Sequence, residues 1–215
     1  MKPFYKRIQF LIIIKRNNTI RYQSFLFFFV EMSNSNFINE FVNGENHVGA
    51  VTPSTKFLVN KMLTNIDFNR DINVVELGPG TGVFTTKMLK KMSFNSKLLS
   101  IELNQYFASK IDAKINDNRF TLVCDSAEKI ENICQRINFP KVDYIISSLP
   151  LAVLPSRLKI NIINECKNIL RDSGSFLQFQ YSLNAKNLLN KKFKEVNVSF
   201  TPLNLPPAFI YHCTT

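Results

Sequence analysis

Three acidic residues stand at or next to the ends of short apolar runs, and their placement could bring them around one ligand. They are Glu76, Glu102 and Asp125. If these runs are parallel strands, their carboxyl ends meet at the same edge of a sheet. Carboxylates gathered there can accept hydrogen bonds from ribose hydroxyls, face an exocyclic amine, or offset a positive charge. The chemistry indicated is the binding of a nucleoside-like cofactor.

A glycine-rich turn follows the first of these runs. Residues 73–83 read Asn-Val-Val-Glu-Leu-Gly-Pro-Gly-Thr-Gly-Val, and apolar residues at helical spacing continue through 84–92. A strand, a glycine turn and a helix open a nucleotide-binding βαβ unit, in which glycines permit a sharp bend and close approach of a ligand. Val83 stands where a dinucleotide fingerprint has its third glycine, and the Gly-Lys-Ser/Thr of a P-loop is absent. An acid two residues before the first glycine instead suits a cofactor with a positive centre. The alternative is a tight turn that binds nothing.

The two later acids each have a functional and a structural interpretation. Glu102 lies 24 residues after Gly78, close to the spacing at which an acid takes the ribose hydroxyls in such units. It could equally be a solvated acid at a strand end. Asp125 could face the amine of an adenine, with the backbone N–H of Ser126 at a ring nitrogen. It could also cap the helix predicted over 126–136, and the two roles are compatible.

The elements that must position these residues alternate between strand and helix. The predicted strands are 74–77, 97–101, 120–124, 142–147, 175–180, 196–200 and 208–213. Six helices are predicted: one that contains Leu58 and Met62, then 84–92, 105–115, 126–136, 156–170 and 184–191. Residues 172–174 are expected to end the helix over 156–170. The last two predicted strands are joined by a short turn. A parallel connection needs a dozen or more residues, so we expect these two strands to pair antiparallel at an edge of the sheet. The pattern predicts an α/β domain with a seven-stranded, mostly parallel sheet, an antiparallel last strand and helices on both faces.

Length and composition fit one globular domain with an acidic partner. The chain has 215 residues, of which 45% are hydrophobic and 20% charged. Its net charge of +11 favours nucleic acid, an anionic membrane surface, or both, and does not choose between them. Four cysteines without Cys-x-x-Cys spacing and only two histidines argue against a zinc site. We expect no metal, and buried thiols in a reducing compartment.

Residues 1–31 differ from the rest of the chain, and residues 32–215 form the predicted domain. The first 31 residues carry six basic residues and one acid, with apolar runs at 10–14 and 25–30. Neither run reaches the roughly 20 residues that span a membrane, and Lys15-Arg16 interrupts a signal-peptide pattern. Three interpretations stay open: a basic amphipathic segment on a membrane surface, a disordered tail, or a non-native extension ahead of a start at Met32.

The motif Glu-Leu-Gly-Pro-Gly-Thr-Gly at 76–82 resembles motif I of class I S-adenosylmethionine (SAM)-dependent methyltransferases. Further blocks resemble bacterial phospholipid N-methyltransferases of the phosphatidylethanolamine and ornithine-lipid type, relatives of the ribosomal-RNA adenine dimethylases. These blocks are Gly-Ala-Val-Thr-Pro-Ser at 49–54, Ser-Leu-Pro-Leu at 148–151, Gln-Phe-Gln-Tyr at 178–181 and Leu-Pro-Pro-Ala at 205–208. The resemblance spans about residues 46–213. It implies a Rossmann-like methyltransferase fold, SAM as cofactor, and N-methyl transfer to the amine of a lipid head group.

By this resemblance, one set of residues would bind SAM, with the adenine at Asp125 and Ser126. The set is Glu76, Gly78, Gly80, Gly82, Glu102, Asp125, Ser126 and Ser147. Tyr181 would face the head group and handle the amine proton, unless it is an ordinary aromatic residue at a strand end. His47 would lie in a loop over the cofactor. No metal or covalent intermediate is required, because SAM is already activated and the protein mainly aligns donor and acceptor.

The acceptor segment also resembles the Asn-Leu-Pro-Tyr/Phe of ribosomal-RNA adenine dimethylases but departs from it. Ser147 stands where those enzymes have an amide, and Leu151 where they have an aromatic residue that stacks the base. Because an adenine amine is a poor nucleophile, the loss of both groups favours an aliphatic amine. RNA methylation remains the alternative, and it expects an additional C-terminal helical domain.

A lipid acceptor would also give the positive charge a role at an anionic membrane surface. Six lysines could form a basic face: Lys56, Lys61, Lys186, Lys191, Lys192 and Lys194. The predicted location is cytoplasmic, with peripheral association to the inner face of the membrane. A third interpretation, a SAM-fold binding module without catalysis, predicts a damaged motif I, and motif I is intact in this sequence.

Overall fold

The computed structural model describes residues 5–16, 19–30, 53–202, 204 and 207–215, with side chains from Lys56 onward. The chain divides into two compact units, Met1–Phe41 and Val42–Thr215. In the first unit, β1 (Tyr5–Arg16) and β2 (Thr19–Val30) form an antiparallel pair, as suits segments rich in β-branched and aromatic residues. This strand pair was not predicted from the sequence. Met32 and His47 lie outside the described residues.

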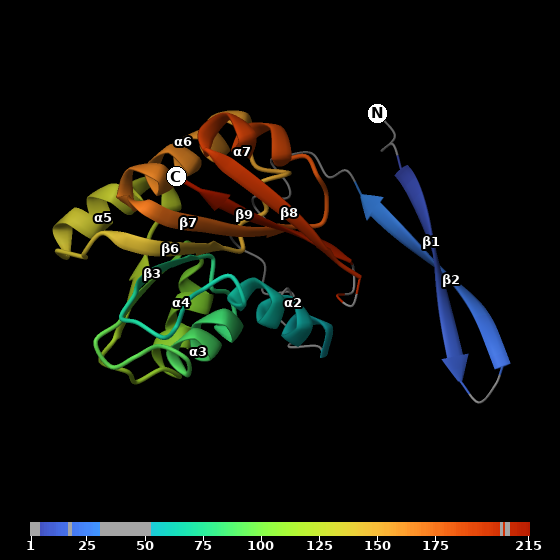
Figure 1. Cartoon of the computed structure of the whole chain (residues 1–215), viewed down its shortest axis with the longest axis horizontal. Helices are drawn as coiled ribbons and strands as arrows, with labels where there is room; N and C mark the ends of the chain where they lie inside the picture. The colour runs from blue at the N-terminus through green and yellow to red at the C-terminus, as the bar shows by residue number, and fades with distance from the viewer. Residues whose placement is uncertain (1–4, 17–18, 31–52, 203, 205–206) are drawn as a thin grey trace. The chain divides into compact units, whose positions relative to one another are not determined.

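The second unit is built on one seven-stranded sheet in the order β5-β4-β3-β6-β7-β9-β8 (Figure 1). Its strands are β3 (Asn73–Leu77), β4 (Lys97–Glu102), β5 (Phe120–Cys124), β6 (Val142–Ser147), β7 (Leu170–Gln180), β8 (Glu195–Thr201) and β9 (Ala208–Thr214). Pairing is parallel from β5 to β7, whereas β9 runs antiparallel to both β7 and β8. The predicted mostly parallel sheet with an antiparallel last strand is confirmed.

Helices cover both faces of the sheet, as predicted (Figure 1). One face carries α2 (Pro53–Leu63), α3 (Val83–Leu89) and α4 (Gln105–Asp112). The other carries α5 (Ile130–Arg136), α6 (Ser156–Ile169) and α7 (Lys186–Lys192). Successive residues of a strand point to opposite faces, so Val74 and Val75 of β3 enter different apolar cores. This two-sided burial explains why the central strands read as continuous apolar runs.

The start of β7 differs from the prediction. The sequence indicates a helix stop at 172–174, but α6 ends at Ile169 and β7 begins at Leu170 without a loop. The register with β6 shifts before Ser175, as in a β-bulge, and this accommodates the polar residues inside the strand. A Cβ on Gly174 would lie 2.9 Å from the Arg171 carbonyl oxygen. Glycine is therefore required there by close packing rather than by a helix end.

The four cysteines are free thiols, but they are not all buried. Cys134, Cys166 and Cys213 lie in the core, whereas Cys124 is exposed at the end of β5. The expectation of a buried thiol is wrong for Cys124, because β5 is an edge strand of the sheet and lies only partly covered.

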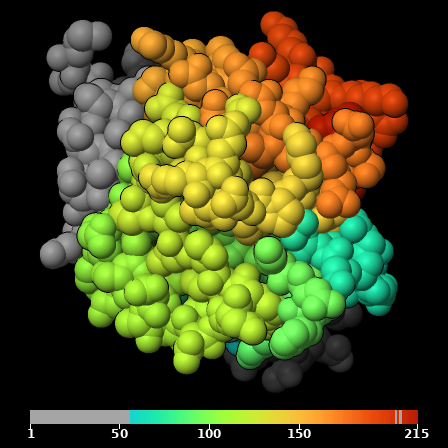
Figure 2. All heavy atoms as spheres, turned by 90° about the vertical axis from the view of Figure 1, so that its left-hand side faces the viewer, coloured from blue at the N-terminus to red at the C-terminus, as the bar shows by residue number. Residues whose placement is uncertain are grey.

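Connections gather at two opposite edges of the sheet. Figure 2 shows the amino edge, where the segments that lead into β4 (green), β5 (yellow-green) and β6 (yellow) lie side by side. The segments that leave the parallel strands, including the glycine turn, emerge at the carboxyl edge. Ligands of open α/β sheets bind outside the carboxyl ends of the strands, so this edge holds the candidate site.

Candidate cofactor and acceptor site

The glycine turn after β3 has a backbone conformation that favours glycine. Gly78, Gly80 and Gly82 have φ angles of 70°, 56° and 75°, in the left-handed region. The N–H of Gly78 donates to the Ile101 carbonyl at 3.0 Å, which ties the turn to β4. A Cβ on Gly80 would meet no atom within 4 Å. The space over Gly80 is thus open, and a ligand can approach the backbone there.

The structure brings Glu102 against this turn. Glu102 is 4% exposed; its Oε2 accepts the N–H of Gly80 at 3.0 Å, and its Oε1 accepts the N–H of Asn104 at 2.9 Å. Each carboxylate oxygen has a second lone-pair direction, so both can accept further hydrogen bonds. The two backbone N–H groups therefore fix the orientation of the Glu102 carboxylate. In this orientation its two oxygens can accept hydrogen bonds from two adjacent hydroxyls of a ligand. Such burial does not fit a simple solvated acid.

Glu76 lies within β3 on the side that carries α3. It is fully buried, and its Oε2 accepts hydrogen bonds from the Ser100 hydroxyl at 2.6 Å and the Thr85 hydroxyl at 2.7 Å. Its Oε1 is buried and has no hydrogen-bond partner among the described residues. Burial raises the pKa of the Glu76 carboxyl to about 7, against the opposing effect of the two hydroxyls.

Thr85 and Ser100 were not predicted as part of the site. Ser100 is the direct neighbour of Glu76 in the β3–β4 register, and Thr85 lies in the first turn of α3. The only sequence signal for them is a hydroxyl at positions that are otherwise buried and apolar.

Asp125 and Ser126 follow β5, whose last residue pairs with the last residue of β4. Asp125 Oδ1 accepts the Ser126 N–H at 2.7 Å and pairs with the Lys129 ammonium at 2.8 Å, which holds the pKa of Asp125 below its ordinary range. Ser126 caps the short 3₁₀ helix η1 (Ala127–Lys129) by accepting the N–H of Glu128 at 3.3 Å. The helix cap is therefore Ser126, and the interpretation of Asp125 as the cap is wrong.

The segment after β6 lies beside the glycine turn. Ser147 is fully buried, and its hydroxyl accepts the N–H of Leu149 at 3.3 Å. The N–H of Ser148 donates to the Leu77 carbonyl at 2.9 Å. Ser147 thus stabilises the conformation of this segment through a buried hydrogen bond. Ser148 is only partly buried and directly precedes Leu149-Pro150, so the comparison with the amide of the adenine dimethylases applies to Ser148 rather than to Ser147.

Leu151 points away from the acceptor side. It is 1% exposed and belongs to the apolar core that also contains Ile162 and Ile163 of α6. The position at which adenine dimethylases carry a stacking aromatic residue is therefore filled by a core side chain. It offers no surface to a flipped base.

Tyr181 follows β7 at the carboxyl edge. It is 45% exposed, and its ring meets that of Phe179 edge-on with 5.8 Å between centroids. Phe179 in turn stacks on Phe84 of α3 at 6.4 Å. Burial of the hydroxyl raises the pKa of Tyr181, and a hydrogen bond with Asn204 opposes the shift. This chain of aromatic contacts connects Tyr181 to the helix that begins at the glycine turn.

Residues 47–201 match the family described as methyltransferase small domain. The chain belongs to this family. An ornithine lipid N-methyltransferase of Singulisphaera acidiphila is 27% identical over 179 residues, which cover 82% of this chain and 93% of that protein. The resemblance to class I SAM-dependent methyltransferases is confirmed, and this chain is a methyltransferase.

Solved structures agree on the fold of this methyltransferase. The N-methyltransferase NodS of Bradyrhizobium japonicum WM9, in complex with S-adenosyl-L-homocysteine, has a TM-score of 0.64 at 11% identity and covers 84% of this chain and 97% of its own. The precorrin-6y C5,15-methyltransferase of Geobacter metallireducens GS-15 has a TM-score of 0.62 at 14% identity, with coverage of 81% and 96%. Both show the Rossmann-like arrangement predicted from the sequence.

SAM is the cofactor of this methyltransferase, and the residues at the carboxyl edge fit it. SAM is a nucleoside that carries a sulfonium and an ammonium group. The open space over Gly80, the two oriented oxygens of Glu102 and the unpartnered buried oxygen of Glu76 offer backbone contact, hydroxyl acceptors and negative charge in one place.

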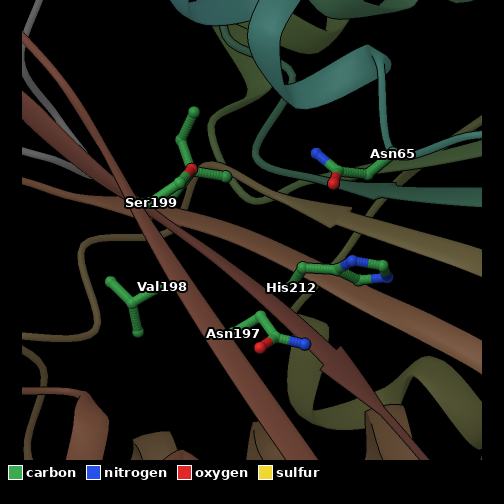
Figure 3. A pocket seen from close by; sticks show the side chains of 6 residues that line it. Asn65, Asn197, Val198, Ser199 and His212 are labelled. Carbon is green, nitrogen blue, oxygen red and sulfur yellow. The ribbon is translucent and has the colours of Figure 1, made fainter.

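A cavity of about 140 Å³ lies apart from these residues (Figure 3). It is lined by Asn65 after α2 and by residues of β8 and β9, including Asn197 and His212. Nε2 of His212 lies 3.0 Å from the Ser175 hydroxyl, and burial lowers the pKa of this imidazole. The cavity contains none of the predicted site residues and offers no charged group to a cofactor.

Proposed function

We propose that this methyltransferase transfers methyl groups from SAM to the amine of a phospholipid or ornithine-lipid head group at a membrane surface. The observation that carries this proposal is the similarity to an ornithine lipid N-methyltransferase over 93% of that protein's length. A similarity of this extent includes the acceptor half of the fold as well as the cofactor half.

On the donor side, we assign Glu102 to the ribose hydroxyls, Asp125 and Ser126 to the adenine, and the glycine turn with Glu76 to the methionine part. SAM supplies a methyl group on a sulfonium, already activated for in-line attack by a nucleophile. The protein contributes alignment, and positioning alone can supply roughly 7–11 kcal/mol. In this scheme Ser147 acts indirectly, because its hydroxyl shapes the segment that separates donor and acceptor.

On the acceptor side, the burial of Leu151 supports an aliphatic amine over a nucleobase. The lone pair of an adenine amine is delocalised into the ring, so such an acceptor needs stacking and amide contacts that orient it. The chain has a core leucine and a serine at the corresponding positions. An aliphatic amine requires less help, since its neutral form attacks readily.

Tyr181 is assigned to the amine, with a narrower role than proton removal. A phenol is protonated near neutral pH, and burial raises the pKa of Tyr181 further, so this side chain is not a base there. Its hydroxyl oxygen can accept a hydrogen bond from an N–H of the amine. The neutral amine attacks the methyl group, and the methylated ammonium product then gives its proton to solvent. We therefore assign Tyr181 to orienting the neutral amine.

Apolar side chains at the carboxyl edge support a membrane-facing orientation. Nine described side chains are large, apolar and exposed, and seven of them lie at this edge. These seven are Phe57, Leu103, Tyr106, Val153, Tyr181, Leu183 and Phe200. We call them the apolar rim. None of the described helices is long and apolar enough to cross a membrane.

The basic residues near the rim differ from those expected. Lys61 donates to the Phe200 carbonyl at 2.6 Å, and residues 191–194 precede β8 at the amino edge, so the six predicted lysines do not form one face. Exposed cations at the carboxyl edge include Lys56, Arg157 and Lys186, each in the first turn of its helix. Each cation near an anionic lipid surface contributes about 1 kcal/mol. The combination of apolar rim and cations fits an anionic bilayer, which is where the proposed acceptor resides.

The test offers several acceptors to the purified full chain with methyl-labelled SAM. The acceptors are vesicles with the same content of an anionic lipid, in which the other lipid is phosphatidylethanolamine, ornithine lipid or phosphatidylcholine; total RNA is offered separately. We expect label in one of the two aminolipids, none in phosphatidylcholine, and loss of labelling in Glu102→Ala. Label in RNA and not in lipid would overturn the proposal and favour the RNA alternative.

A further inference from the structure

Three hydrogen-bond donors converge on one backbone carbonyl in the acceptor segment. The Leu149 carbonyl oxygen accepts from Gln180 Nε2 at 2.8 Å, from Gln178 Nε2 at 3.1 Å and from the N–H of Leu151 at 2.8 Å. Both glutamines are buried, at 4% and 0% exposure. A carbonyl oxygen has two lone pairs, so three donors leave it no capacity for another partner.

The two glutamine side chains hold the segment differently. Gln180 also accepts the N–H of Ala152 through its Oε1 at 3.1 Å, so its amide bridges two points of the segment. Gln178 also donates to the Phe179 carbonyl at 2.7 Å, while its buried Oε1 has no partner among the described residues. A buried amide oxygen without a partner costs about 1–3 kcal/mol. Gln178 therefore contributes less to stability than its burial suggests, which indicates another role.

Leu149 also contacts the cofactor side. A Cβ on Gly78 would lie 3.1 Å from Leu149 Cδ2, and the adjacent Ser148 N–H is bonded to β3. The side chain of Leu149 therefore rests on the glycine turn while its carbonyl is held by β7. This one residue joins the two halves of the site.

We propose that Gln178 and Gln180 are positioning residues that hold the acceptor segment against the glycine turn. Their hydrogen bonds also occupy the Leu149 carbonyl oxygen, so this oxygen cannot accept a hydrogen bond from the acceptor amine. Methyl transfer requires the nitrogen lone pair to point at the methyl carbon, and N–H groups held by acceptors set that direction. With this carbonyl occupied, the segment cannot hold a planar amine by its backbone at Leu149. Orientation of the amine is left to Ser148 and Tyr181, which suits a tetrahedral, aliphatic nitrogen.

The test compares Gln180→Glu with Gln135→Glu, the same change at an exposed position of α5. A carboxylate at position 180 keeps an oxygen for Ala152 but places a second oxygen against the Leu149 carbonyl. We expect the amides of Leu151 and Ala152 to exchange hydrogen about tenfold faster or more, and kcat with the preferred acceptor to fall about tenfold to a hundredfold. The affinity for SAM should stay within about twofold, because the bonds of Glu102 do not involve β7.

A second variant covers the case in which Gln180→Glu fails to fold. Gln178→Met removes the bonds to the Leu149 and Phe179 carbonyls and also the unpartnered buried oxygen, at similar volume. Because these two effects on stability oppose each other, we expect a reduced kcat with little change in Tm. Unchanged exchange or unchanged kcat in the folded variants would overturn the proposal. So would a loss of SAM affinity as large as the loss of kcat, since that is the result of a merely structural role.

This proposal rests on methyl transfer itself and not on the lipid acceptor. The hydrogen-exchange and SAM-binding arms need no acceptor, and the kcat arm uses whichever acceptor the wild-type chain methylates. If the lipid assay fails, the role of the two glutamines is therefore still tested by these measurements.

Discussion

At the residue scale, Glu76 makes the stability of the ligand-free protein depend on pH. Burial gives its carboxyl a pKa of about 7 in the folded state, against an ordinary value of 4.5. Between these values the folded state binds more protons than the unfolded state, so the free energy of unfolding falls as pH rises from about 4.5 to about 7. The shift corresponds to on the order of 3 kcal/mol.

We expect Glu76→Gln to remove most of this dependence. The glutamine oxygen can still accept from Ser100 and Thr85, and no charge has to be buried at high pH. Urea unfolding at pH 5 and pH 8 should show the variant losing less stability than wild type, by on the order of 1–3 kcal/mol. Glu195→Gln, at an exposed position of β8, is the control and should behave as wild type. Equal losses in wild type and Glu76→Gln would contradict the burial of a charged Glu76.

Glu102 carries the strongest prediction about cofactor binding. Glu102→Ala removes the carboxylate that would accept two hydrogen bonds donated by the ribose hydroxyls, each worth about 1.5–3 kcal/mol. We expect the Kd for SAM to rise roughly a hundredfold or more, with the fold retained. Calorimetric titration of SAM, with Glu195→Ala as the matched control, measures this. If SAM affinity survives in both the Glu102 and the Glu76 variants, the site assignment is wrong.

Local spacing predicted some residue contacts and not others. The approach of Glu102 to the glycine turn follows from its place at the end of the second strand of the βαβ unit. The bonds from Thr85 and Ser100 to Glu76, and from Gln178 to Leu149, depend on strand register and on side-chain packing across elements. No pattern within one segment encodes those contacts.

At the element scale, the glycine turn between β3 and α3 makes a separate prediction. Gly80→Ala places a methyl group in open space, so its structural cost is the strain of a left-handed residue, about 1–2 kcal/mol. If that space receives SAM, the methyl group also obstructs the ligand. We expect a modest fall in Tm and a SAM affinity reduced about tenfold or more, measured by thermal unfolding and calorimetry.

A position outside the turn separates these two effects. Asn138 has a φ of 50° in the segment between α5 and β6, far from the carboxyl edge. Asn138→Ala also introduces backbone strain, though less than Gly80→Ala because asparagine already occupies the left-handed region at some cost. It does not approach the turn, so it should lower Tm slightly and leave SAM affinity unchanged. A Gly80→Ala protein that binds SAM like wild type would show that the ligand lies elsewhere.

Most element boundaries were predictable because burial and periodicity agree in this sheet. The predicted bounds of β5 and β6 match the structure, since each strand begins at the first residue of a largely apolar segment. The prediction failed at the junction of α6 and β7, where Gly174 and its polar neighbours resemble a turn. There the chain stays extended because β6 supplies pairing partners from outside the segment.

At the scale of the whole molecule, the apolar rim predicts how the protein meets a bilayer. Leu183→Asp or Val153→Asp places a charge in the rim and should weaken binding to anionic vesicles severalfold, because an acid is repelled by the surface and an apolar contact is lost. Phe94→Asp is the matched control, since Phe94 is 79% exposed but lies before β4, at the opposite edge. Vesicle co-sedimentation measures the difference. Equal effects at both edges would remove the orientation that we propose.

Net charge alone did not identify this surface. The value of +11 indicated an acidic partner, but several predicted cations lie at the amino edge or are engaged within the fold. Which residues share an edge depends on the direction in which each connection runs. That direction became clear only with the strand order of the complete sheet.

The most direct measurement follows methyl groups from SAM into the lipids of a host that expresses the full chain. Lipids extracted after feeding with labelled methyl donor are separated by thin-layer chromatography, with cells that carry Glu102→Ala beside them. We predict labelled N-methylated derivatives of phosphatidylethanolamine or ornithine lipid with wild type, and none with the variant. Lipids without label while RNA gains it, or equal labelling with Glu102→Ala, would contradict the proposed reaction at this site.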